Sequence, residues 1–216
     1  MEKAVEMTTM RLTVPVIAIL RGVERDFFGD LMRVSFAVGL QAIEVTMNTA
    51  GAEEMVRDCR PEVPAGKFLG MGTIRNLHEA ERAAAAGAMF LVTPNLDVRV
   101  IEFGRAMNIP VIAGALTPTE IFAAWAAGAA MVKVFPCGAM GGPRYISDLR
   151  GPFEMIPLVA VGGVSQDNAA AYLAAGARAV GVGVSFFGRE AYQRKNLEEV
   201  AVHVEKFLEK LSDSAG

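Results

Sequence analysis

The chain repeats one pattern of prolines and glycines four times, and this repetition restricts the possible folds more than any other feature. Short runs rich in Val and Ile alternate with longer segments rich in Ala, Glu and Arg, which is typical of parallel βα units. Apolar-Pro-apolar triplets open the odd-numbered runs at intervals of 46 to 49 residues, at Pro15, Pro64, Pro110 and Pro157. Helix-ending glycines open the even-numbered runs at intervals of 41 to 48 residues, at Gly39, Gly87, Gly128 and Gly176. The chain is therefore interpreted as four copies of a (βα)₂ unit.

The runs with the length and composition of strands number eight: 15–20, 41–46, 67–72, 89–93, 110–114, 130–135, 157–162 and 178–183. This pattern predicts an α/β fold, a closed (β/α)₈ TIM barrel somewhat shorter than the typical size of about 250 residues. The alternative, a doubly wound open sheet, would be expected to carry a glycine-rich nucleotide fingerprint after the first run, and Leu20–Arg25 contains none. No linker interrupts the pattern, so we expect residues 1–216 to form a single barrel domain. Residues 1–11 would be an extra N-terminal segment, for which a helix is one interpretation.

Composition argues against several classes of function. The formal net charge is −3 and no Lys/Arg cluster is present, which argues against a nucleic-acid partner. No apolar stretch approaches the roughly 18 residues of a membrane span, and Met1–Lys3 lacks the basic-then-apolar layout of a signal peptide. Cys59 and Cys137 form no disulfide or metal pattern, so a cytoplasmic location fits best.

The two histidines narrow the chemistry further. His78 and His203 both lie in helix-like segments. A zinc aldolase or a Ser-His-Asp hydrolase would need imidazoles close to the predicted strand ends. If the chain is an enzyme, its acid–base chemistry must therefore use carboxylate, lysine, hydroxyl or water, and no metal site is expected.

Two ionisable residues lie inside apolar runs. Lys133 lies in Met131–Pro136, where burial would penalise the ammonium, lower its pKa and leave a nucleophilic amine suited to Schiff-base chemistry. The alternative is a strand-end lysine whose ammonium reaches water. Glu44 lies in Ala42–Thr46 and could neutralise Lys133 across the barrel, transfer protons, or do both. Two such residues on different strands of one barrel favour a catalytic pair.

Other candidates lie where the predicted strands end, which is where (β/α)₈ barrels carry their chemistry. Glycine clusters at Gly162-Gly163 and at Gly181–Ser185 follow the last two runs. Small residues there let backbone N–H groups approach an anion, as in the phosphate sites of these barrels. Arg21 after the first run and Thr73 after the third could bind a carboxylate through a guanidinium fork and a hydroxyl.

With these residues in view, the chain resembles the 2-keto-3-deoxy-6-phosphogluconate (KDPG) aldolase family of class I aldolases. The family includes 4-hydroxy-2-oxoglutarate (KHG) aldolases and phosphogalactonate-specific relatives. The resemblance covers roughly Val14 to Phe187. It rests on six motifs taken together: Ala18–Gly22, Ile43–Thr46, Gly70–Thr73, Val92–Asn95, Val132–Pro136 and Val161–Val164.

The resemblance implies a role for each candidate. Lys133 would form the Schiff base and Glu44 would be the general acid–base, while Thr73 and an arginine would bind the substrate carboxylate. The remaining implied site residues would lie by the phosphate or line the pocket: Gly162, Gly163, Ser185, Pro94 and Phe135. The implied substrate is a phosphorylated keto acid, a 2-keto-3-deoxy-6-phospho sugar acid, cleaved to pyruvate and glyceraldehyde 3-phosphate. No metal or organic cofactor is implied, and a homotrimer is expected.

Two departures from the family pattern leave substrate preference open. Many members have arginine shortly after the catalytic glutamate, where this chain has Asn48, and we expect Arg21 to supply the clamp instead. Met71 replaces a common alanine, and its bulk is expected to narrow the pocket. The Val92–Asn95 stretch resembles the phosphogalactonate branch. A phosphate-binding barrel without a Schiff base, such as an epimerase or thiamine-phosphate synthase, and a catalytically silent phosphosugar-binding protein are the remaining alternatives.

Overall fold

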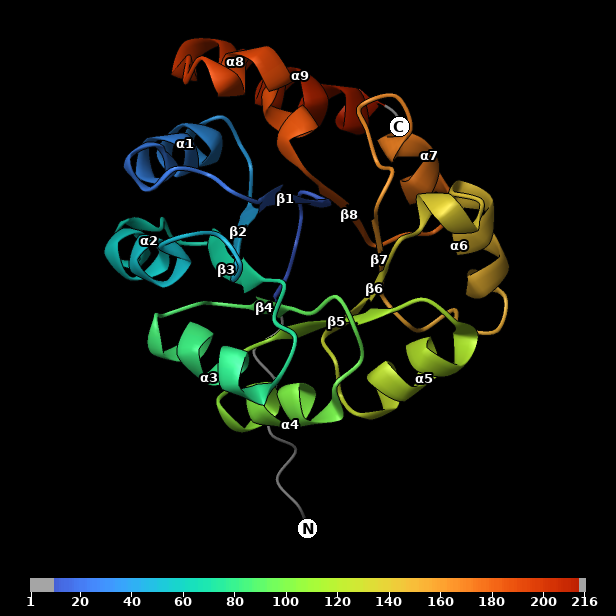
Figure 1. The fold of residues 1–216 in the computed structure, drawn as a ribbon. Coiled ribbons are helices and arrows are strands. Elements are labelled where there is room, and N and C mark those ends of the chain that lie inside the picture. The colour runs from blue at the N-terminus through green and yellow to red at the C-terminus, as the bar shows by residue number, and fades with distance from the viewer. Residues whose placement is uncertain (1–9, 214–216) are drawn as a thin grey trace.

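Eight parallel strands close into a barrel in which the strand order follows the chain (Figure 1). The structure is a computed structural model that describes residues 10–213. The strands are β1 Val16–Leu20, β2 Ala42–Thr46, β3 Phe68–Gly72, β4 Leu91–Val92, β5 Val111–Ala115, β6 Met131–Val134, β7 Leu158–Val161 and β8 Ala179–Val182. The first strand pairs with the last, because β1 is hydrogen-bonded to both β2 and β8. The predicted (β/α)₈ barrel is confirmed.

Helices connect successive strands and surround the barrel (Figure 1). Across residues 10–213 the α-helices are α1 Arg25–Ala37, α2 Ala52–Cys59, α3 Leu77–Ala85, α4 Val98–Ala106, α5 Pro118–Ala126, α6 Pro143–Arg150, α7 Ala169–Ala174, α8 Arg189–Gln193 and α9 Leu197–Asp213. Short 3₁₀ helices are η1 Arg60–Glu62, η2 Gly138–Met140 and η3 Val184–Phe187. In this part of the chain, none of the helices combines the length and the apolar character needed to cross a bilayer.

Local sequence signals account for the helix boundaries. Thr117 and Glu120 form a reciprocal capping box at the start of α5, in which each side chain binds the other residue's backbone N–H. Asn196 accepts a hydrogen bond from the Glu199 N–H at the start of α9. The glycines that separate helices from even-numbered strands all have φ between 95° and 107°, namely Gly39, Gly87, Gly128 and Gly176. Left-handed backbone of this kind favours glycine, which explains why glycine recurs at these four positions of the sequence.

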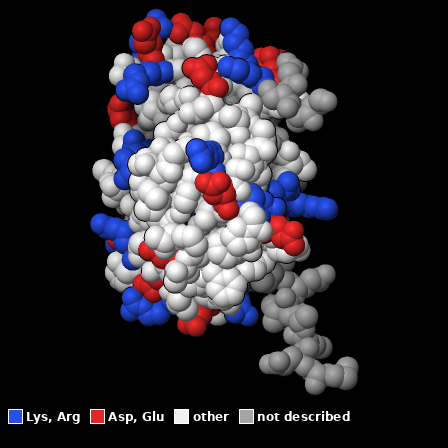
Figure 2. Space-filling view, turned by 90° about the vertical axis from the view of Figure 1, so that its right-hand side faces the viewer, with Lys and Arg blue, Asp and Glu red and all other residues white. Residues whose placement is uncertain are grey.

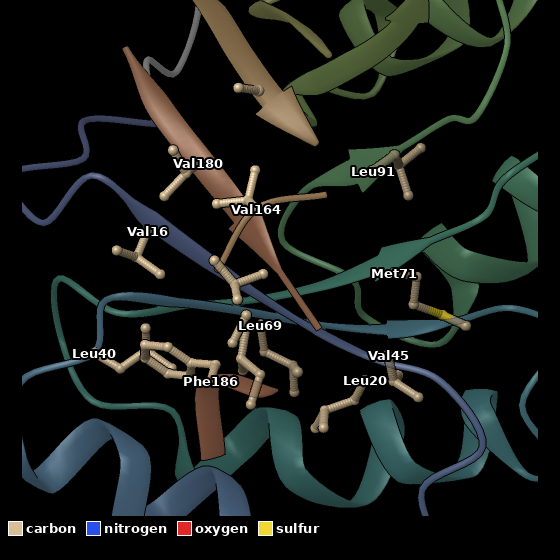
Figure 3. Close-up of a cluster of buried hydrophobic side chains, with 14 of the residues drawn as sticks. Val16, Leu20, Leu40, Val45, Leu69, Met71, Leu91, Val164, Val180 and Phe186 are labelled. Carbon is tan, nitrogen blue, oxygen red and sulfur yellow. The ribbon is translucent and has the colours of Figure 1, made fainter. Parts of the chain in front are cut away.

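Alternation along the strands divides the core in two. One set of buried side chains fills the barrel interior and includes Ile17, Phe90 and Ile112. The other lies between strands and helices and is drawn in Figure 3. Met71 belongs to this outer cluster and is fully buried there (Figure 3). The expectation that Met71 narrows the pocket is therefore wrong, because successive residues of a strand face opposite sides and Met71 faces the helices.

The start of the described chain fills one end of the barrel. Met10 and Leu12 are buried in the interior cluster. The Gln41 side chain accepts hydrogen bonds from the backbone N–H groups of Thr13 and Val14 at 2.8 and 3.1 Å, which ties this segment to β2. The expected N-terminal segment falls mainly on residues 1–9, which lie outside the described residues.

The fourth strand is shorter than predicted. The sequence suggested 89–93, whereas β4 comprises Leu91–Val92. The neighbouring backbone still bonds to adjacent strands: Met89 N–H donates to the Leu69 carbonyl at 2.8 Å and Thr93 N–H to the Ile112 carbonyl at 3.1 Å. The extended segment therefore has the predicted length, but regular pairing is confined to its centre.

Candidate active site

Strand register directs Lys133 and Glu44 into the barrel. Lys133 on β6 is paired with Gly114 on β5 and Val159 on β7. Val159 belongs to the interior cluster, and residues paired across adjacent strands face the same side of a sheet. Glu44 on β2 shares its register with Ile19, which packs against the same interior cluster. Two residues 89 positions apart in the sequence are thereby directed into one interior.

Lys133 is buried, with 6% of its surface exposed. Burial lowers the pKa of its amine, the nearby Glu44 carboxyl opposes that shift, and Arg21 adds to it. The Nζ atom lies 5.0 Å from the centre of the Phe135 ring, an arrangement that favours a positive charge on the nitrogen. Burial is the largest influence on this pKa, and its net direction is downward. The snorkelling alternative does not apply to this side chain.

Glu44 is 1% exposed, and burial raises its pKa to about 7, although the positive charges of Lys133 and Arg21 oppose the shift. Its Oε2 is the one buried side-chain N or O atom without a hydrogen-bond partner among the described residues. No ion pair within 4.0 Å joins Glu44 to Lys133 in this part of the chain. The carboxyl group therefore faces the same pocket as the amine without being held in a salt bridge, which leaves it able to exchange protons.

A glycine on the adjacent strand makes room for this carboxyl group. A Cβ atom at Gly72 would lie 2.3 Å from Glu44 Oε1, closer than real contacts allow. Gly70, two residues earlier on β3, likewise makes room for the Phe90 ring, because a Cβ atom at Gly70 would lie 2.5 Å from a carbon of that ring. The glycines of the Gly-Met-Gly-Thr motif thus provide the space in which a glutamate can stand inside the barrel.

Arg21, Asn48 and Thr73 meet at the mouth of the pocket, from the loops after β1, β2 and β3. The Arg21 guanidinium donates to Asn48 Oδ1 at 3.1 Å and to Thr73 Oγ1 at 3.2 Å. Thr73 has φ = +56°, a left-handed conformation that is strained for a β-branched residue. Thr73 thus has this strained backbone at the position where its hydroxyl accepts the hydrogen bond from Arg21.

Replacing Thr73 by glycine is expected to stabilise the fold while weakening ligand binding. Glycine adopts φ near +56° without strain, and the relief of about 1–3 kcal/mol exceeds the entropy cost of roughly 1 kcal/mol for an added glycine. We expect a net gain of about 1 kcal/mol in the free energy of unfolding, measured by urea denaturation, together with weaker binding of keto acids. Thr73→Ser is the matched control because it keeps the hydroxyl. A less stable Thr73→Gly protein would contradict this account of the strain.

The pocket has a volume of about 230 Å³ and opens at the carboxyl ends of the strands. Its lining contains eight of the nine residues that the sequence suggested: Arg21, Glu44, Thr73, Pro94, Lys133, Phe135, Gly162 and Gly163. Ser185 is not among the lining residues; it is exposed in η3, two residues beyond the lining Gly183. A loop after β6 supports the glycine pair, since Gly138 N–H donates to the Gly162 carbonyl at 2.8 Å.

Sequence reasoning did not assign a role to several lining residues. Ile19 and Val161 form an apolar wall beside Lys133, and both approach Gly181, where a Cβ would meet them at 3.0 and 2.8 Å. The signal for Ile19 is its place two residues before Arg21, which gives both residues the same strand face. Across residues 10–213, no group of three or more His, Cys, Asp or Glu side chains could hold a metal ion. The pocket lining itself contributes an amine, a carboxyl group, a guanidinium and the hydroxyl of Thr73.

Comparisons with known proteins point to one family. The family model described as KDPG and KHG aldolase matches residues 6–203. The chain is 34% identical to the probable 2-dehydro-3-deoxy-6-phosphogalactonate aldolase of Rhizobium meliloti (strain 1021), over 80% of this chain and 82% of that protein. It is 35% identical to the 2-dehydro-3-deoxy-phosphogluconate aldolase of Treponema pallidum (strain Nichols), over 67% and 68% of the two chains.

One of the similar solved structures contains a covalent reaction intermediate. It is KDPG aldolase from Legionella pneumophila with pyruvate captured at low pH as a covalent carbinolamine intermediate. This chain is similar to it with a TM-score of 0.83 and 25% identity, covering 90% of this chain and 94% of that one.

Proposed function

Because this chain belongs to the KDPG and KHG aldolase family, we propose that it acts as a class I aldolase with Lys133 as its nucleophile. Its reaction is the cleavage of a 2-keto-3-deoxy-6-phospho sugar acid to pyruvate and glyceraldehyde 3-phosphate. One observation carries the assignment of residues: a buried lysine whose pKa is lowered by burial lines the same pocket as an unpaired, buried glutamate. In such a pair, burial favours the uncharged, nucleophilic form of the amine, and the carboxyl group can carry protons.

The first chemical step forms the Schiff base. The neutral amine of Lys133 attacks the C2 carbonyl carbon, and loss of water from the resulting carbinolamine gives an iminium. The Phe135 ring, 5.0 Å from Nζ, stabilises the positive charge that the iminium carries. The iminium is the electron sink for the next step.

Glu44 moves the protons of the cleavage. It takes the proton of the C4 hydroxyl, directly or through a water, as the electrons of the C3–C4 bond pass into the iminium. Glyceraldehyde 3-phosphate leaves, the enamine is protonated at C3, and hydrolysis releases pyruvate and the free lysine. A pKa raised to about 7 suits a group that must both accept and return a proton.

The two ends of the substrate have separate binding groups in this proposal. Arg21 and Thr73 bind the carboxylate next to the reacting ketone, because a guanidinium and a hydroxyl both donate hydrogen bonds. In this proposal the backbone N–H groups of Gly162 and Gly163 donate to the phosphate at the end of β7, and Ser185 approaches it from η3. Pro94 and Phe135 form the apolar sides of the pocket.

The test is turnover of the purified protein with the two C4 epimers, 2-keto-3-deoxy-6-phosphogluconate and 2-keto-3-deoxy-6-phosphogalactonate, with pyruvate release as the readout. 4-Hydroxy-2-oxoglutarate, which lacks the phosphate, measures what the phosphate contributes. We expect cleavage of a phosphorylated keto acid without added metal. Tight binding of these compounds with no pyruvate released would overturn the proposal in favour of a phosphosugar-binding protein.

We also propose that the protein forms a homotrimer through an apolar face. The side carrying α5 and α6 has a broad uncharged area that is interrupted by charged side chains near its middle and bordered by others (Figure 2). Phe122 on α5 is 58% exposed and stacks on Phe153, and Met155 is 77% exposed. Large exposed apolar groups in one region mark association surfaces. Light scattering should give three times the chain mass for wild type and a smaller species for Phe122→Asp; a monomeric wild type would contradict the proposal.

A cytoplasmic location is part of the same proposal. Cys59 and Cys137 are both buried as free thiols, which suits a reducing compartment. A phosphorylated keto acid is the only small-molecule partner that the reaction requires.

A further inference from the structure

The carboxylate-binding arginine of the proposed site is held by neutral groups. Arg21 is exposed, and its two hydrogen-bond acceptors are the amide oxygen of Asn48 and the hydroxyl of Thr73. Six other arginines of the described chain are paired with carboxylates within 4.0 Å: Arg25, Arg33, Arg75, Arg82, Arg99 and Arg194. Within residues 10–213 Arg21 has no such pair. Its positive charge is therefore fixed in place without being neutralised.

Asn48 is a well-anchored acceptor although its side chain is exposed. Thr49 N–H donates to the Thr46 carbonyl at 2.8 Å, closing a turn around Asn48, and Met47 N–H donates to the Gly72 carbonyl at 2.7 Å. The loop after β1, which carries Arg21, is also tied to this turn, because Gly22 N–H donates to Thr49 Oγ1 at 2.9 Å. Thr49 Oγ1 is in turn 2.9 Å from Thr46 Oγ1. The turn thus presents the Asn48 amide at a fixed place beside Arg21.

We propose that Asn48 is a positioning residue that holds the Arg21 guanidinium over the pocket while leaving its charge available, and that it thereby makes the site selective for 2-keto acids over neutral ketones. The inference rests on the proposed function, since it concerns the carboxylate next to the reacting carbonyl. An amide oxygen accepts the guanidinium hydrogen bond but carries no charge. An aspartate at this position would accept the same bond and cancel the charge that a substrate carboxylate must meet.

The experiment compares a charged and a neutral ketone of nearly the same shape. Pyruvate and pyruvamide are each incubated with the full-length protein and borohydride, and the concentration giving half-maximal adduct is measured by mass spectrometry. The variants are Asn48→Asp, Asn48→Ala and a control, Asn108→Asp. Asn108 follows α4 at the opposite end of the barrel from the pocket, so this control adds the same charge far from Arg21.

For Asn48→Asp we expect the half-maximal pyruvate concentration to rise about tenfold or more, because the charge-assisted bond to the carboxylate is lost. The pyruvamide value should stay within about twofold of wild type. Asn48→Ala should raise the pyruvate value by about threefold, since Thr73 alone then holds an arginine that keeps its charge. Asn108→Asp should change neither value.

Equal losses for pyruvate and pyruvamide in Asn48→Asp would overturn the inference, because a merely structural role of Asn48 affects both ketones alike. An unchanged pyruvate value would overturn it as well. Should Asn48→Asp fail to fold, the Asn48→Ala ratio of the two ketones decides the matter in the same way. A wild-type protein that forms no pyruvate adduct overturns the proposed function itself, and this outcome is distinguishable because it appears before any substitution is made.

Discussion

Replacing Lys133 by methionine is expected to lower kcat/KM for the phosphorylated keto acid by about 10⁴-fold or more. Methionine matches the length of the lysine stem but has no amine, so the iminium that accepts the C3–C4 electrons cannot form. The fold should survive, because the substitution removes a buried amine that lacks an ion pair in the described chain and replaces it with an apolar group of similar volume. Steady-state pyruvate release measures the loss, and thermal unfolding checks the fold.

Borohydride trapping with pyruvate locates the reacting amine. Wild type should gain a reduced three-carbon adduct on the peptide containing Lys133, and Lys133→Met should gain none. Lys67 is a matched control: burial also lowers its pKa, but its Nζ donates to the Leu40 carbonyl and it does not line the pocket. Lys67→Met should trap pyruvate as wild type does. Full activity in Lys133→Met, or an adduct on Lys67 instead, would refute the Schiff-base mechanism at Lys133.

Replacing Glu44 by glutamine is expected to lower kcat by about 10² to 10⁴-fold, the usual range for loss of a general acid–base. Glutamine has the same shape and fits beside Gly72, so the change isolates proton transfer from packing. Because the proton must be accepted by a carboxylate, wild-type kcat/KM should rise as pH increases through about 7, where Glu44 ionises. Glu44→Gln should lack this limb of the profile.

The same substitution should also change how stability depends on pH. Burial raises the pKa of Glu44 from 4.5 to about 7, so in this interval the folded protein holds a proton that the unfolded chain releases. The wild-type free energy of unfolding therefore falls as pH rises from about 4.5 to about 7, by roughly 3 kcal/mol, and then levels off. Glu44→Gln cannot ionise and should not show this fall. Urea denaturation of both proteins at about pH 5 and pH 8 measures the change in the free energy of unfolding between the two pH values. An equal change in wild type and Glu44→Gln would show that Glu44 is not buried as described.

Much of the fold could be predicted from local patterns. The prolines that precede odd-numbered strands and the left-handed glycines after helices impose their conformations within a few residues of themselves, so their spacing marks the βα units. Lys133 and Glu44 were also identifiable, because an ionisable residue in a run of strand length is unusual whatever surrounds it. The capping residues Thr117 and Asn196 act within one turn of a helix and could be read in the same way.

Which side of a strand points into the barrel interior could not be predicted in the same way. Met71 was expected in the pocket and lies among the helices, because a strand's sequence shows that faces alternate but not which face is the interior. Ser185 lies on the 3₁₀ helix η3 after β8, outside the pocket lining, so its approach to the phosphate stays a prediction. The contact between neighbouring loops could not be predicted either: Arg21 after β1 and Asn48 after β2 are neighbours in space but 27 positions apart in the chain.

The sequence by itself determined the kind of barrel, its βα repeats and the two ionisable residues placed inside strands, since these depend on conformational preferences that act over a few residues. Only the tertiary structure decided that Glu44 faces Lys133 without an ion pair, that Gly72 leaves space for the carboxyl group, and that Asn48 holds Arg21. These relations depend on barrel closure and on the register between strands, which are set by the packing of the whole interior and not by any one segment.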